Sequence, residues 1–206
     1  RVIAPGGAVT TLAGSAGSPG SADGLGATAQ FNGPRAIAVD GSGGVYVADT
    51  GNHTVRRIAA GGLVQTIAGL ARSAGSTDGT GSGARFNAPG GVAVDAAGNV
   101  YVGDTNNSTV RRITPAGVVT TLGGTAGSAG NVDGTGAVAR FDHPAGLAAD
   151  GAGRIYLADY RNHTIRRGVL AGTDGGAGGG GSGGDGGSGG GGSDGGSGGD
   201  EFIGSA

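Results

Sequence analysis

Hydrophobic and polar residues alternate along this chain in short segments, and turn-forming residues separate the segments. The stretch 91–123 shows the pattern most plainly, since it contains GVAVD, VYVGD, TVRRIT and VVTTLG in succession. Val, Ile, Thr and Tyr favour strands, whereas the intervening Gly, Asn, Asp and Pro favour turns. No window shows the 3.6-residue period of an amphipathic helix. The pattern therefore predicts an all-β chain of short antiparallel strands.

The whole pattern recurs in three copies at a spacing of 55 residues. Phe31, Phe86 and Phe141 mark this spacing, and many other side chains keep the same phase. These are a Pro, a Tyr, an Asn, several Asp and a pair of Arg. Each copy holds four strand segments, which we name a to d in chain order. Four-stranded antiparallel units that repeat their side chains predict the blades of a β-propeller.

The strand segments follow one another in the order d, abcd, abcd, abc, so the chain holds about three blades. The units lie near residues 14–68, 69–123 and 124–169, and residues 1–13 form the end of a preceding unit. The propeller segment therefore spans residues 1–170.

The remaining residues, 171–206, form a second region that is rich in Gly, Ser and Asp. Such a composition cannot bury a hydrophobic core, so we expect a disordered tail or flexible linker. A second interpretation concerns residues 195–203, which fit a calcium-binding nonapeptide with Asp200 as the ligand.

The repeated residues resemble a known family. The run DGTGSGARFNAPGGVAVDAAGNVYVGDTNNSTVRRITPAGVVTTLGG (78–124) is similar to an NHL repeat of the long, bacterial type. The first and third units carry the same signature in FNGPRAIAVDGSGGVYVADTGNHTVRRI and FDHPAGLAADGAGRIYLADYRNHTIRR. The resemblance covers about residues 1–169. It implies a β-propeller, most often six-bladed, that binds a protein, peptide, glycan or RNA, and the related propellers include lyases and lactonases.

Three units supply only half of a six-bladed ring, and an open half-ring leaves strand edges unpaired. Two interpretations follow. The chain is a piece of a longer protein, or two copies close the ring as a homodimer. In the second case the d segment at residues 7–13 would complete the last blade of the partner.

Composition narrows the classes of partner. The chain has 13 cationic residues, all Arg, and 15 acids, of which five lie in residues 171–206; the first 170 residues therefore carry 13 − 10 = +3. So small a charge gives no reason to expect a nucleic-acid partner. There is no Cys, which excludes disulfides and thiol catalysis. No apolar run reaches the ~20 residues of a membrane helix. The abundance of Arg, Ala and Gly suggests a GC-rich bacterium, and we expect an extracellular, periplasmic or cell-surface setting.

Candidate binding residues lie where the three copies differ. In an up-and-down blade the b–c turns and the d–a loops lie on one face, and loops on a rigid scaffold often bind ligands. The b–c turns read TGNH (50–53), TNNS (105–108) and YRNH (160–163), so Tyr160 and Arg161 depart most from the repeat. The candidate ligand-binding residues on this face are Arg35, Asn52, His53, His143, Tyr160, Arg161 and His163.

The histidines raise the alternative of a metalloenzyme. His53 and His163 occupy one repeat position, but Ser108 replaces them in the second unit, so the fold does not require an imidazole there. Together with His143 they could hold a divalent metal in the central channel of a lyase- or lactonase-like enzyme, since a metal needs at least three ligands. We expect binding rather than catalysis and assign no catalytic residue.

The acid that ends strand b is present in all three units, as Asp49, Asp104 and Asp159. A side chain repeated in every blade is expected to be structural. It either accepts backbone N–H groups of the following turn or pairs with an Arg of strand c. Consecutive Arg residues in strand c point to opposite sides of the sheet, so we expect one of each pair at the interface between blades.

Overall fold

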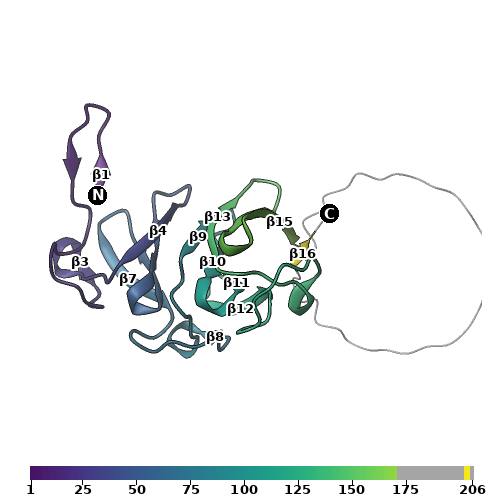
Figure 1. The fold of residues 1–206 in the computed structure, drawn as a ribbon. Helices are drawn as coiled ribbons and strands as arrows, with labels where there is room; N and C mark the ends of the chain where they lie inside the picture. Colours follow the sequence, from purple (N-terminus) through teal and green to yellow (C-terminus); the bar gives the residue numbers. More distant parts are fainter. Residues whose placement is uncertain (171–201, 205–206) are drawn as a thin grey trace, which may run out of the picture.

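The computed structural model describes residues 1–170 and 202–204. Within these residues every sheet is antiparallel, and the only helical pieces are single 3₁₀ turns. Figure 1 shows three sheets following one another in chain order, with a hairpin projecting beside the first sheet. These sheets are the blades of a β-propeller, as the sequence predicts. Most of the predicted tail lies outside the described residues.

Blades 1 and 2 have the same strand order, and each consists of strands a to d with one added outer strand. Blade 1 contains β4 (Pro34–Val39), β5 (Val45–Asp49), β6 (Thr54–Ile58) and β7 (Leu63–Ala68), with β3 (Gly24–Leu25) added beside β7. Blade 2 contains β9 (Gly91–Val94), β10 (Val100–Asp104), β11 (Thr109–Ile113) and β12 (Val118–Gly123), with β8 (Gly79–Thr80) added beside β12. The four predicted strands are confirmed. The fifth was not predicted, because a two-residue strand has no hydrophobic period of its own.

Blade 3 and the N-terminal hairpin differ from this plan. Blade 3 contains β13 (Pro144–Ala149), β14 (Arg154–Asp159), β15 (Thr164–Leu170) and β16 (Phe202–Gly204). The hairpin consists of β1 (Val2–Ile3) and β2 (Val9–Thr10). The strand β16 was not predicted. It pairs with the far end of β15, opposite Gly168–Leu170.

Each blade has two apolar faces because strand residues alternate. We call the face toward the next blade in the chain the leading face and the opposite one the trailing face. Tyr46, Ala48 and Val55 on the leading face of blade 1 form one core with Val92 and Val100 on the trailing face of blade 2.

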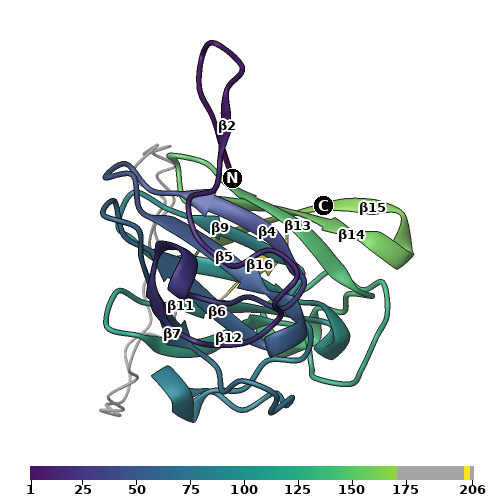
Figure 2. The same ribbon diagram turned by 90° about the vertical axis from the view of Figure 1, so that its left-hand side faces the viewer.

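The interface between blades 2 and 3 repeats this arrangement. Ala93, Tyr101 and Val110 on the leading face of blade 2 share a core with Leu147 and Ile155 on the trailing face of blade 3. Stacking of leading on trailing faces therefore forms both cores between the described blades, by the same residue positions. A third cluster lies on the trailing face of blade 1, which faces the viewer in Figure 2, where Val47 and Val64 pack with Leu12 and Phe31.

Candidate functional site

The three b–c turns are single 3₁₀ turns of one geometry. They span Thr50–Asn52, Thr105–Asn107 and Tyr160–Asn162. The residue that follows each turn is in the left-handed region, with φ of 58° at His53, 56° at Ser108 and 56° at His163. Few non-glycine side chains tolerate this region. The left-handed backbone therefore limits which residues fit this position. The sequence alone, with His in two turns and Ser in one, did not reveal this limit.

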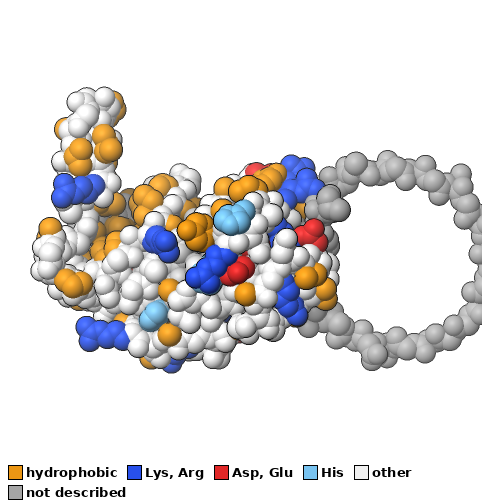
Figure 3. All heavy atoms as spheres, viewed as in Figure 1, with side chains coloured by type: hydrophobic (Ala, Val, Ile, Leu, Met, Phe, Trp, Pro, Cys, Tyr) orange, Lys and Arg blue, Asp and Glu red, His pale blue; other side chains and the backbone are white. Residues whose placement is uncertain are grey.

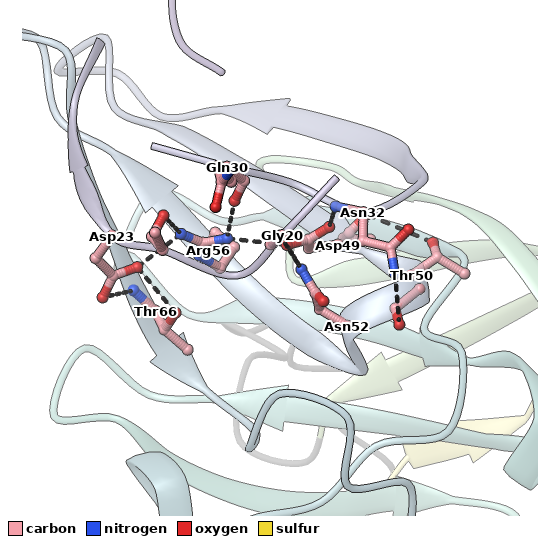
Figure 4. A network of polar contacts seen from close by, with 12 residues as sticks. Gly20, Asp23, Gln30, Asn32, Asp49, Thr50, Asn52, Arg56 and Thr66 are labelled. Carbon is pink, nitrogen blue, oxygen red and sulfur yellow. Dashed lines mark hydrogen bonds and ion pairs between the residues drawn. The ribbon is translucent and has the colours of Figure 1, made fainter. Parts of the chain in front are cut away.

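A buried carboxylate organises each of these turns. In blade 1, Asp49 accepts the backbone N–H of Asn32 at 2.7 Å, the Nδ2 of Asn52 at 2.7 Å and the guanidinium of Arg56 at 2.9 Å (Figure 4). Asp104 in blade 2 and Asp159 in blade 3 make the same three kinds of contact. The predicted pairing with Arg is confirmed. The predicted acceptance of backbone N–H groups from the following turn is wrong, since that N–H comes from a residue 17 positions upstream.

The first Arg of each pair continues the network outward. Arg56 is fully buried and also donates to Asp23 at 2.7 Å and to the carbonyls of Gln30 and Ala22 at 2.9 Å. Its guanidinium lies 4.9 Å from the centroid of the Phe31 ring. The arginine is thus enclosed by its own unit. The d–a loop folds over it. The second Arg of the pair, Arg57, lines the cleft between blades 1 and 2 and lies 3.9 Å from Asp40, as expected for one member of each pair.

Thr66 completes this network in blade 1. Its backbone N–H and hydroxyl donate to the carboxylate of Asp23 at 3.1 and 3.0 Å, and strand d is thereby tied to the loop (Figure 4). Thr121 and Asp78 repeat both contacts in blade 2. Asp133 in blade 3 pairs with Arg166, but no strand-d threonine reaches it within the described residues.

Burial raises the pKa of one carboxylate, and hydrogen bonding lowers the pKa of another. Burial raises the pKa of Asp104 to about 6, against the lowering effect of its bonds from Asn87, Asn107 and Arg111. Asp40, in the a–b turn of blade 1, is half-buried. Hydrogen bonds from the Ser42 hydroxyl and from the turn backbone lower its pKa to about 2.

Two of the predicted site residues, Asn52 and His53, make structural contacts. Asn52 is 1% exposed and donates to the Gly20 carbonyl at 2.7 Å, which fixes the d–a loop against the turn. The Nδ1 atom of His53 accepts the backbone N–H of Ala88 in blade 2 at 3.0 Å. His53 is half-buried and links two blades.

The remaining predicted residues are more open. Tyr160 is 68% exposed, and Arg161 and His163 in the same turn are exposed. Arg35 is exposed at the start of strand a of blade 1. His143 is half-buried, with Nδ1 at 2.6 Å from Asp142 Oδ1.

The structure does not group the histidines as a metal site. Within residues 1–170 and 202–204, no three His, Asp or Glu side chains lie together so that they could hold an ion. The three-histidine alternative therefore has no supporting geometry in the described part of the chain.

A hollow on the opposite face was not predicted. A cleft of about 420 Å³ lies between blades 1 and 2, beside the a–b and c–d turns. Tyr46, Arg57, Gln65 and Gly98 are among its lining residues. The guanidinium of Arg57 lies 5.8 Å from the Tyr46 ring centroid. Strand residues line much of this cleft. The differences among the turn sequences therefore did not indicate it.

Comparison with known proteins agrees with the repeat geometry. The NHL repeat family matches residues 31–58, 86–113 and 141–167. The chain carries three NHL repeats. These matches cover strands a to c of blades 1 to 3, where the Asp–Arg network recurs.

Two curated proteins are similar over part of the chain. Protein SUPPRESSOR OF QUENCHING 1, chloroplastic, of Arabidopsis thaliana is 35% identical over 95 residues, which are 46% of this chain and 9% of that protein. NHL repeat-containing protein 2 of Bos taurus is 35% identical over 133 residues, which are 59% of this chain and 18% of that protein. The NHL chain thus spans less than a fifth of the curated relatives it matches.

Among solved structures, an auxiliary nutrient binding protein from Bacteroides ovatus ATCC 8483 has the same fold. It matches with a TM-score of 0.60 at 28% identity, over 69% of this chain and 38% of that one. No helix in the described part of the NHL chain is long and apolar enough to cross a membrane.

Proposed function

We propose that this NHL chain is a binding scaffold, and that its ligand contacts the face made by the b–c turns and d–a loops. The observation that carries the proposal is the contrast within this face. The backbone of the three turns is the same, whereas the outward side chains differ. Repeated buried contacts hold the turns, and the exposed positions are left free to vary.

The rigidity of the face favours binding. Asn52 and its counterparts Asn107 and Asn162 each hold a d–a loop by a bond of 2.7 Å to a glycine carbonyl. A surface that is ordered before a ligand arrives loses little conformational entropy on binding. The name of the nutrient binding protein from Bacteroides ovatus agrees with a binding role.

Tyr160 and Arg161 indicate the ligand chemistry. An exposed aromatic ring beside a guanidinium can stack on the flat face of a sugar or a peptide side chain and can bind a carboxylate. We therefore propose a peptide, protein or glycan ligand that carries an acidic group, held near His163. An extracellular, periplasmic or cell-surface setting belongs to the same proposal.

A titration followed by NMR tests this function. We expect ¹⁵N amide signals of residues 160–163 to shift when an acidic oligosaccharide or an acidic peptide is added to the full chain. Tyr160→Ala and Arg161→Ala should each weaken binding by roughly tenfold, as is typical of aromatic and arginine anchors. Arg154→Ala, at the exposed start of β14 in the same blade, is the matched control and should leave binding unchanged.

Two outcomes would contradict the proposal. One is a shift confined to Arg57, Gln65 and Gly98, which would place the ligand in the cleft on the opposite face. The other is metal-dependent turnover of a lactone or of a lyase substrate, which would favour the enzyme alternative.

A further inference from the structure

The cleft between blades 1 and 2 has one wall from each blade. On blade 1, Tyr46, Arg57 and Gln65 lie directly opposite one another on β5, β6 and β7, so they form one row across the leading face. On blade 2, the a–b turn contributes Gly98 and the c–d turn contributes Pro115. A Cβ at Gly98 would lie 3.5 Å from Pro115, so these two turns are in contact. Both walls therefore belong to packed elements of the fold.

The floor and the outer end of this cleft are closed. Val100 lies in the core between the blades together with Tyr46, and both line the cleft, so its floor is apolar. At the outer end, a Cβ at Gly117 would lie 3.7 Å from the carbonyl of Ile67, so the c–d turn of blade 2 touches strand d of blade 1. The volume of about 420 Å³ falls within the range of about 300–1,000 Å³ that is typical of small-molecule sites. The cleft can therefore hold one small ligand.

The guanidinium of Arg57 is the main hydrogen-bond donor in the cleft. The preceding residue, Arg56, donates to two carboxylates and two carbonyls. Among the described residues none accepts a hydrogen bond from Arg57, and its Nε atom is buried without a partner. Its nearest acid, Asp40, lies 3.9 Å away, which is beyond hydrogen-bond distance. The N–H groups of Arg57 are thus available to a ligand.

The guanidinium of Arg57 has room here because residue 44 is a glycine. In blade 2 the same repeat position is Asn99, whose side-chain amide donates to Asp95 at 2.9 Å. In blade 1 a Cβ at Gly44 would lie 3.0 Å from the Nη2 atom of Arg57. The arginine therefore occupies space that a side chain would fill, and this departure from the repeat shapes the cleft.

The charges beside the cleft balance one another. Asp40, whose pKa is about 2, is ionised at neutral pH and lies next to Arg57. An anionic ligand would therefore face a carboxylate as well as a guanidinium. A broad cationic field is what attracts an anion, and Figure 3 shows Arg side chains scattered over the visible face rather than gathered in one patch. These observations favour a ligand without net charge.

We propose that this cleft binds one neutral sugar unit. Sugar hydroxyls accept from the guanidinium of Arg57, and they both donate to and accept from the exposed amide of Gln65. Ile67 and Pro115, which also line the cleft, contact the apolar C–H surface of the ring. The site lies on the face opposite the b–c turns, so it is additional to the proposed site for an acidic ligand.

Titration of the full chain with neutral sugars, followed by NMR, tests this proposal. The probes are D-glucose, D-galactose and N-acetyl-D-glucosamine, each added alone. We expect at least one of them to shift the amide signals of Gly98 and Gly117, the side-chain amide of Gln65 and the Nε–Hε signal of Arg57. The signals of residues 160–163 should stay in place. Sodium glucuronate, a sugar of similar size with a carboxylate, should not bind more tightly than the neutral sugars.

Substitution of the donor gives a matched pair of variants. Arg57→Met should weaken sugar binding roughly tenfold, which is the effect of losing one hydrogen bond to a charged group. Arg154→Met is the control, because Arg154 also pairs with the Asp of its own a–b turn, at 3.4 Å from Asp150, but lies in blade 3. Gly44→Asn, which gives blade 1 the residue of blade 2, should weaken binding by displacing the guanidinium.

A blocking variant leaves every polar group in place. Ala97 is exposed and lines the cleft, whereas the adjacent Ala96 is exposed outside it. Ala97→Leu should weaken sugar binding by filling part of the cleft, and Ala96→Leu should not. Thermal unfolding of each variant shows whether the fold is kept.

The proposal is overturned if none of the three sugars shifts the cleft signals, or if glucuronate or free L-alanine shifts them in place of the neutral sugars. Equal effects within either pair of matched variants would also overturn it. None of these results bears on the acidic ligand of the b–c turns, because that ligand is detected at residues 160–163 and by Tyr160→Ala. The two proposals can therefore fail separately.

Discussion

The buried ion pairs hold the parts of each blade together. Arg56 and Asp49 both have fully buried side chains. The carboxylate accepts hydrogen bonds from a loop N–H and from the side-chain amide of the turn. The guanidinium donates to two loop carbonyls and to Asp23. Burying charges is tolerated only when they are paired and hydrogen-bonded. This requirement explains why the residues recur together at a fixed spacing.

Removing the buried guanidinium of Arg56 should lower the stability of the fold much more than removing that of Arg57. We expect Arg56→Met to lower the free energy of unfolding by about 3–5 kcal/mol, because it leaves the Asp49 carboxylate buried without its cation. Arg57→Met should lower it by about 1 kcal/mol or less, since Arg57 is 36% exposed and lies 3.9 Å from Asp40. Urea denaturation of the two variants measures the difference. Equal losses would contradict a structural role for the network.

Part of this buried network could be predicted from the sequence, and part of it could not. Repetition identified Asp49 and Arg56 as structural, and the pairing was predicted. The sequence could not show that the d–a loop covers the arginine, because that loop has no hydrophobic period. Nor could it show that His53 and Ser108 share a left-handed backbone, since the three turns were compared only by side-chain chemistry.

At the scale of elements, close approach between neighbouring blades matters as much as strand pairing. Gly91 begins β9 on the leading face of blade 2, and a Cβ at this position would clash with the Ala145 carbonyl in blade 3. The position therefore requires a residue without a side chain. Interfaces between blades are packed backbone to backbone at this point.

A methyl group at Gly91 should separate blades 2 and 3. We expect Gly91→Ala to lower the free energy of unfolding by at least about 2 kcal/mol through overpacking. Gly41→Ala, in an exposed turn where a Cβ meets nothing within 4 Å, should change it by less than about 0.5 kcal/mol. Thermal unfolding of both variants tests this. A Gly91→Ala variant as stable as the control would mean that the blades stack less closely than described.

The elements themselves were largely predictable, since strands a to d alternate and their turns carry Gly, Asn and Asp. What escaped prediction were β3, β8 and β16, each of two or three residues. Their pairing is set by the neighbouring edge strand and not by their own side chains.

At the scale of the whole molecule, the chain is an open row of three blades. On the trailing face of blade 1, Ile37 and Val39 are exposed, whereas Val47 and Val64 are buried. Sequence periodicity predicted the number of blades, but a repeat carries no information on what covers the first and last of them. The structure adds that Leu12 and Ala13 of the N-terminal segment pack against the trailing face of blade 1.

An NMR titration of the b–c turns tests the account most directly. When an acidic oligosaccharide or an acidic peptide is added to the full chain, the amide signals of residues 160–163 should shift, and Tyr160→Ala should weaken binding by roughly tenfold. Shifts confined to Arg57, Gln65 and Gly98, which line the cleft on the opposite face, would contradict the account.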